Sequence, residues 1–83
     1  MERADALTAI CEVAVEVLEV SPDAVVEAAR FAEDLDADSL DLVELVMGLE
    51  ERFEVSIPEE DLNGVVTVGG AVDLLLAKLS AAR

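Results

Sequence analysis

The segment from residue 40 to residue 53 carries apolar side chains on two opposite faces when it is drawn as a helix. At roughly 100° per residue, one group clusters within about 60°, well inside a core-facing stripe. That group consists of Leu42, Val46, Leu49 and Phe53, with Leu45 at its edge. The opposite side carries Leu40, Val43 and Met47, set among acidic residues. We therefore expect one face of this helix to build a core and the other to contact proteins.

The chain of 83 residues is long enough for one small domain, residues 1–83, and too short for two. Apolar residues make up 54% of the chain and aromatic residues only 2%, so the core must be built from aliphatic side chains. This apolar content also argues against a disordered acidic chain, because such chains contain few apolar residues. We therefore expect a folded single domain.

Charge narrows the range of partners. Twenty acidic residues against five basic ones give a net charge of −15, which repels nucleic acids and anionic membranes and favours basic protein partners. A purely solubilising surface explains the charge equally well. The single cysteine allows no disulfide within the chain, which fits a reducing compartment. Because we find no signal peptide and no bilayer-spanning stretch, we expect a cytoplasmic location and no stable membrane insertion.

Residues 4–19 are predicted to form the first helix, because their apolar residues recur at intervals of three and four. Val13, Val15 and Val17 alternate with other residues as in a short strand, but no second alternating run exists to pair with it. Cys11 lies on the apolar side of the helix. We therefore expect a buried, unreactive thiol.

The segment after the first helix has conflicting signals. Ser21 and Pro22 are typical of a helix start, and local rules alone extend that helix to Arg30. The charge run that follows is poor in helix-forming residues. We therefore predict a long connection with one helical turn, anchored to the core by Phe31 and Leu35.

The later elements have clear start signals. Asp38 or Ser39 caps the second helix, and Asp41 faces the positive end of its dipole. Pro58, followed by three acids, begins a short helix, and Thr67 caps the last one. The pattern thus predicts four helices and no strand.

Catalysis by the chain itself is not expected. Ser39 has no histidine to activate it, and acids on an open helix surface, such as Glu50 and Glu51, remain solvated. The acids before Ser39 begin like an EF-hand calcium loop, but the required glycine and final glutamate are missing, so no metal site is predicted. Judged by position alone, Ser39 is explained by helix capping.

Residues 33–47, with the sequence EDLDADSLDLVELVM, resemble the phosphopantetheine attachment region of acyl carrier proteins, above all the discrete carriers of type II fatty acid synthesis. The resemblance continues through residues 49–53, Ile57-Pro58 and Thr67-Val68. It implies an all-α fold, a four-helix bundle with a long first loop and a short third helix. It also implies that a phosphopantetheinyl transferase moves 4'-phosphopantetheine from coenzyme A to Ser39. The thiol of that arm then carries acyl chains as thioesters to fatty acid synthesis enzymes.

The resemblance also assigns two sets of residues and a monomeric carrier. Partner enzymes with basic patches are expected to bind the outer face of the second helix, made of Asp38, Leu40, Asp41, Val43, Glu44, Met47, Glu50 and Glu51. The growing acyl chain is expected to enter a pocket lined by Val46, Leu49, Phe53, Ile57, Leu62 and Val65.

Three positions depart from the family pattern, and one of them is Gly70, which stands where a larger or polar residue is more usual. Asp36 stands where the family usually has glycine, so the loop is expected to bend differently. Gly48 replaces a usual alanine at a cost of about 1 kcal/mol, for close packing or for close approach of a partner. Two alternative functions stay open: a carrier for a polyketide or other specialised pathway, and an acidic helical adaptor without a prosthetic group.

Overall fold

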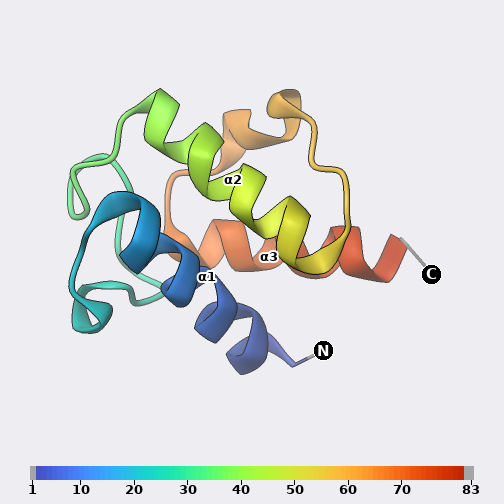
Figure 1. The fold of residues 1–83 in the computed structure, drawn as a ribbon, viewed down its shortest axis with the longest axis horizontal. Coiled ribbons are helices and arrows are strands. Elements are labelled where there is room, and N and C mark those ends of the chain that lie inside the picture. The colour runs from blue at the N-terminus through green and yellow to red at the C-terminus, as the bar shows by residue number, and fades with distance from the viewer. Residues whose placement is uncertain (1, 82–83) are drawn as a thin grey trace.

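The computed structural model describes residues 2–81, which form three α-helices and two short 3₁₀ helices (Figure 1). The elements in order are α1 (Arg3–Leu18), η1 (Pro22–Ala24), α2 (Ser39–Phe53), η2 (Glu59–Gly64) and α3 (Val68–Ala81). The all-α class is confirmed, and the expected short third helix is η2. None of the helices within residues 2–81 is long and apolar enough to cross a membrane.

The helix α1 packs against both other long helices and forms the centre of the core. Its stripe of Ala6, Ile10 and Ala14 has no exposed surface, so the predicted helix and its buried face are confirmed. Cys11 lies at the edge of that stripe and is only half-buried, with its sulfur 3.7 Å from the carbonyl oxygen of Pro22. The expectation of a buried thiol is therefore wrong, because the loop covers this edge incompletely.

The connection between α1 and α2 contains a single helical turn, η1, as predicted. Its backbone then pairs with the start of α3: the N–H of Phe31 donates to the oxygen of Val66 at 3.0 Å, and the N–H of Val68 donates to the oxygen of Ala29 at 2.9 Å. Phe31 and Leu35 are buried. Past η1 the chain forms turns and no further helix, because its backbone bonds to the segment around the start of α3 and its apolar side chains reach the core.

Arg3 ties the loop and α3 to the start of α1. Its guanidinium lies 2.5 Å from a carboxylate oxygen of Glu27 in the loop and 2.5 Å from one of Asp73 on α3. The hydrogen bond from Arg3 to Glu27 raises the pKa of Arg3 above its usual range, and the hydrogen bond to Asp73 adds a smaller contribution. We call this cluster of three side chains the Arg3 clasp.

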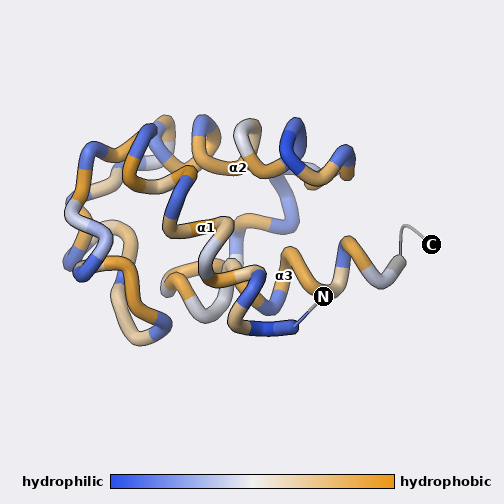
Figure 2. The backbone as a smooth tube through the Cα atoms, turned by 60° about the horizontal axis from the view of Figure 1, so that its bottom comes forward, coloured by the Kyte–Doolittle hydropathy of each residue, from blue (hydrophilic) through white to orange (hydrophobic). Residues whose placement is uncertain are grey.

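Gly48 is explained by close packing of α1 on α2. A Cβ atom added at Gly48 would lie only 2.8 Å from Cγ1 of Val13, which is closer than two carbon atoms normally approach. The opposite side of α2 faces solvent. Figure 2 shows the hydrophobic positions of α2 mostly toward the other helices and hydrophilic positions along its outer edge.

Candidate functional site

Ser39 is the first residue of α2, and its side chain is exposed. The helix is capped by Asp38, whose carboxylate accepts a hydrogen bond from the N–H of Asp41 at 2.9 Å. The Asp41 carboxylate accepts from the N–H of Asp38 at 3.2 Å, which completes a capping box. Within residues 2–81, no hydrogen bond engages the hydroxyl group of Ser39. The sequence left open whether Asp38 or Ser39 caps the helix, and the structure gives that role to Asp38.

A surface hollow lies beside Ser39, between the start of α2 and η2. It is lined by Ser39, Leu42, Val43, Glu59, Glu60, Leu62 and Asn63. The hollow has apolar walls and polar edges, which suits an arm that contains both amides and methylene groups. The first N–H groups of α2 point toward the same end, where a phosphodiester is favoured, although the nearby Asp38 and Asp41 oppose its charge. The residues present therefore fit a phosphopantetheine arm on Ser39.

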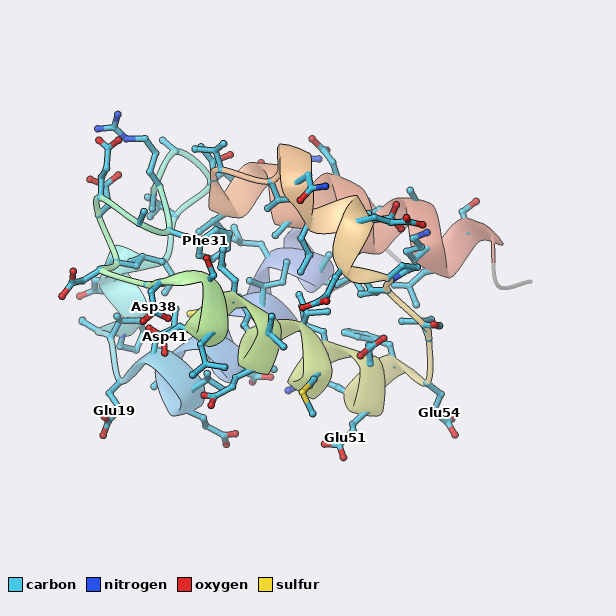
Figure 3. The ribbon with its side chains drawn as sticks, turned by 90° about the horizontal axis from the view of Figure 1, so that it is seen from above. Glu19, Phe31, Asp38, Asp41, Glu51 and Glu54 are labelled. Carbon is cyan, nitrogen blue, oxygen red and sulfur yellow. The ribbon has the colours of Figure 1, made fainter. Side chains whose placement is uncertain are left out.

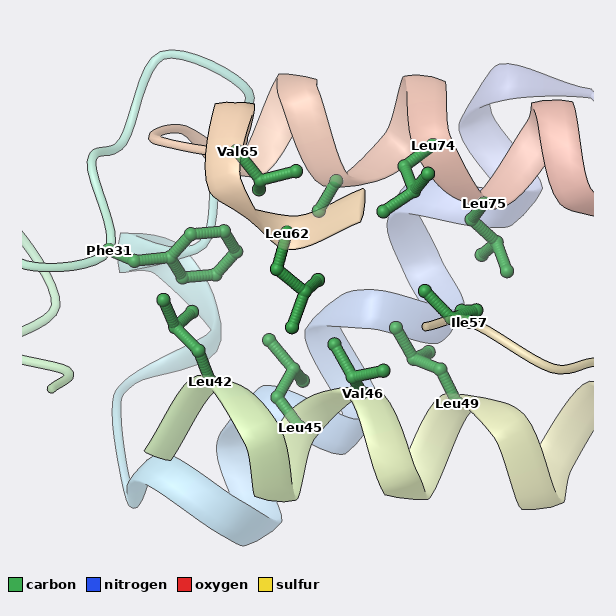
Figure 4. A pocket seen from close by; sticks show the side chains of 11 residues that line it. Phe31, Leu42, Leu45, Val46, Leu49, Ile57, Leu62, Val65, Leu74 and Leu75 are labelled. Carbon is green, nitrogen blue, oxygen red and sulfur yellow. The ribbon is translucent and has the colours of Figure 1, made fainter. Parts of the chain in front are cut away.

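A second, enclosed cavity lies between α2, η2 and α3 (Figure 4). Its volume is about 20 Å³, close to the space of one water molecule. The lining is Phe31, Leu42, Leu45, Val46, Leu49, Ile57, Leu62, Val65, Ala71, Leu74 and Leu75. Leu42 and Leu62 also line the hollow beside Ser39, so these two side chains separate the hollow from the cavity.

Five of the six residues predicted for the acyl pocket line this cavity; Phe53 does not. Phe53 lies half-buried in the last turn of α2, beyond the end of the cavity. The predicted set lacked Phe31, Leu42 and Leu45, and it also lacked the contribution of α3. The signal for α3 was present, because positions 71, 74 and 75 share one helical face.

The predicted partner face is mostly exposed on α2. Leu40 is 65% exposed and Met47 is 57% exposed, and their spacing places both on the same side of α2 as Val43. Figure 3 shows Asp38 and Asp41 at the start of α2 and Glu51 near its other end. Val43 is half-buried and Glu44 is exposed. These residues form a continuous apolar and acidic surface beside Ser39.

Glu50 is the one member of the predicted face that turns away from it. Its carboxylate accepts a hydrogen bond from the backbone N–H of Ile57 at 2.7 Å. The side chain is half-buried and holds the loop before η2 against α2. Its position in the structure is therefore that of a loop anchor.

Comparison with known proteins identifies the class of protein to which this chain belongs. Residues 8–75 match the family described as "Phosphopantetheine attachment site", which covers most of the chain. The acyl carrier protein of Sulfurovum sp. (strain NBC37-1) is 55% identical over 64 residues, which is 77% of this chain and 85% of that protein. The acyl carrier protein of Thermosynechococcus vestitus is 43% identical over 81 residues, which is 98% of this chain and 100% of that protein.

A third relative, the acyl carrier protein of Wolinella succinogenes, is 56% identical over 63 residues, covering 76% of this chain and 83% of its own length. The chain belongs to the acyl carrier protein family. The resemblance read from residues 33–47 is thereby confirmed.

Proposed function

We propose that this chain carries acyl groups as thioesters on a 4'-phosphopantetheine arm attached to Ser39. One observation supports the choice of Ser39 above all others. Its hydroxyl group is exposed at the start of α2, while the capping role that would otherwise explain a serine there belongs to Asp38. The hydroxyl is therefore free to react, beside a hollow of suitable lining.

The chain is a carrier and not an enzyme. It contains no histidine, and the two carboxylates that line the hollow, those of Glu59 and Glu60, form no hydrogen bond with the hydroxyl group of Ser39. We therefore expect the transferase to supply the base that accepts the proton of Ser39. The hydroxyl oxygen forms a bond to the phosphorus that bears pantetheine in coenzyme A, and adenosine 3',5'-bisphosphate leaves. Once bound, the arm supplies a terminal thiol that holds acyl groups as thioesters.

The enclosed cavity is the proposed site for the acyl chain. In the chain without an acyl group it has room for about one water molecule, so an alkyl chain must displace Leu42 and Leu62 to enter. Every lining side chain is apolar, which favours transfer of methylene groups from water by about 0.8 kcal/mol each. The proposed partners are the enzymes of fatty acid synthesis, and the proposed carrier is a monomer in the cytoplasm. Its acidic α2 face binds the basic patches of these enzymes.

The experiment is intact-protein mass spectrometry before and after incubation with coenzyme A and a phosphopantetheinyl transferase. We expect one phosphopantetheine adduct on the wild-type chain and complete loss of the adduct in Ser39→Ala. The variant should keep its fold, because Asp38 caps α2 in either protein. Ser21→Ala is the matched control, since Ser21 is also exposed and makes no capping hydrogen bond with its side chain.

Two results would contradict the proposal. An adduct that persists in Ser39→Ala would place the arm on another residue. A folded wild-type chain that arrives unmodified and gains no mass would instead favour an adaptor without a prosthetic group.

A further inference from the structure

A groove runs between α1 and α2 on a side of α2 away from the acyl cavity. Val13 and Val17 of α1 and Met47 of α2 give it an apolar lining. Gly48 lies between them and has no side chain to fill the groove. The close approach of Val13 to Gly48 holds the two helices together at this point. The groove is thus a built feature of the α1–α2 packing.

The rim of the groove is acidic and unpaired. Glu16 of α1 and Glu44 and Glu51 of α2 stand around the apolar lining, and all three are exposed. None of the three forms an ion pair within residues 2–81. The guanidinium of Arg52, which also borders the groove, is paired with Glu12.

The remaining basic side chains between residues 2 and 81 also have partners elsewhere in the fold. Arg3 belongs to the Arg3 clasp, Arg30 pairs with acids of its own loop, and Lys78 pairs with Asp61. Within the described part of the chain the three rim glutamates therefore have no basic partner, and a cationic side chain of another protein can pair with them.

We propose that the groove between α1 and α2 binds an arginine-bearing segment of the partner enzymes, so that recognition includes α1 as well as α2. This rests on the proposed carrier function, because those enzymes are the partners. The aliphatic stem of an arginine fits the apolar lining of Val13, Val17 and Met47, while its guanidinium reaches the glutamates of the rim. Both chemical features of the groove are satisfied by this one side chain.

The position of the groove fits a partner that also reaches the arm. Glu44 and Met47 belong to both the groove and the α2 face, so the two surfaces are continuous. At a rise of 1.5 Å per residue, the groove residues of α2, from Glu44 to Arg52, lie roughly 8 to 20 Å along the axis from Ser39. A single protein interface of ordinary size spans that distance.

The test compares Glu16→Lys with Glu54→Lys as substrates of the phosphopantetheinyl transferase and, as holo proteins, of an acyl-loading enzyme. Both variants change the net charge equally at an exposed glutamate, but Glu54 does not line the groove. With at least one of the two enzymes, we expect Glu16→Lys to raise KM about fivefold at low salt while kcat stays unchanged. We expect Glu54→Lys to raise KM less than about twofold with either enzyme. Added salt should shrink the difference.

Glu16→Gln should give an intermediate KM, and circular dichroism should show that each variant keeps the helical fold. Equal KM values for Glu16→Lys and Glu54→Lys with both enzymes would overturn the groove proposal, even though mass spectrometry shows the adduct on Ser39. Absence of any adduct on the wild-type chain would overturn the carrier function and the groove proposal with it. The two failures are therefore distinguishable.

Discussion

The side of the bundle where α1 meets α3 is packed differently from the side where α2 meets η2. On the first side, Ala6, Ile10, Val68 and Val72 have no exposed surface, and the Arg3 clasp ties the elements together. On the second side, η2 has no fully buried residue, and the enclosed cavity lies beneath it. The small alanines of α1 allow close approach, whereas the branched leucines of α2 and α3 leave space between them.

Few polar contacts hold η2 in place. The carboxylate of Glu50 accepts from the N–H of Ile57 just before η2, and Lys78 of α3 pairs with Asp61 within it at 2.6 Å. The first contact lies before η2 and the second engages the side chain of Asp61, so neither involves the apolar side chains of η2. Under the proposed function, the closely packed side holds α2 in place while the side beneath η2 opens to admit the alkyl chain.

The largest expected effect is a difference in stability between two core truncations, one on each side of the bundle. Ile10→Ala should destabilise the fold by about 2–5 kcal/mol, because Ile10 is fully buried and its neighbours cannot close the space. Leu62→Ala should cost only about 1 kcal/mol, because Leu62 is half-buried and already borders a cavity. Urea unfolding measures both free energies. Equal costs at an unchanged m-value would show that the two sides are packed alike.

A second variant tests the contact between α1 and α2. Gly48→Ala gains about 1 kcal/mol of helix propensity but places a methyl group against Val13, where overpacking costs about 1–3 kcal/mol. We expect a net loss of about 1 kcal/mol in the wild-type background. In a Val13→Ala background the same change should stabilise the fold by about 1 kcal/mol, because the obstructing methyl groups are gone.

Thermal and urea unfolding of the four proteins in this cycle give the coupling between the two positions. A Gly48→Ala effect of the same sign and size in both backgrounds would mean that α1 and α2 are further apart than the structure places them.

Local sequence signals predicted the helices well, because caps and apolar periodicity act within one element. Thr67 illustrates this: its hydroxyl accepts from the N–H of Gly70 at 3.1 Å, as a capping residue should. Features set by contacts between elements were not predictable in the same way. The turn of Glu50 toward Ile57 depends on where the loop before η2 runs, and the α1–α2 groove depends on how closely Val13 approaches Gly48.

In the candidate site, too, local features were predictable from the sequence and features set by contacts between elements were not. Ser39 was assigned from a contiguous motif, but only the folded structure shows that Asp38 takes the cap and leaves the hydroxyl free. Phe53 has the right helical angle for the acyl cavity and the wrong position along the helix axis. Angular periodicity finds a face, and tertiary packing decides how much of that face a cavity uses.

The smallest expected effect on stability is at Asp36, in the loop that leads from α1 to α2. Asp36 lies in the loop just before α2. It is exposed, whereas its neighbours Leu35 and Ala37 are buried. Asp36 has a φ of 54°, in the left-handed region that favours glycine. The aspartate adopts the backbone conformation for which glycine is suited.

Asp36→Gly and Asp36→Ala remove the same charge, so a comparison of the two isolates the backbone. The left-handed conformation costs a residue with a Cβ atom about 1–2 kcal/mol, while glycine loses about 0.4–1 kcal/mol more chain entropy on folding. We therefore expect Asp36→Ala to be less stable than Asp36→Gly by about 0.5–1 kcal/mol in urea unfolding. Both variants should still accept the arm on Ser39, because neither changes the capping box of α2. An alanine variant at least as stable as the glycine variant would show that residue 36 does not hold a left-handed bend, and that the loop reaches α2 by another path.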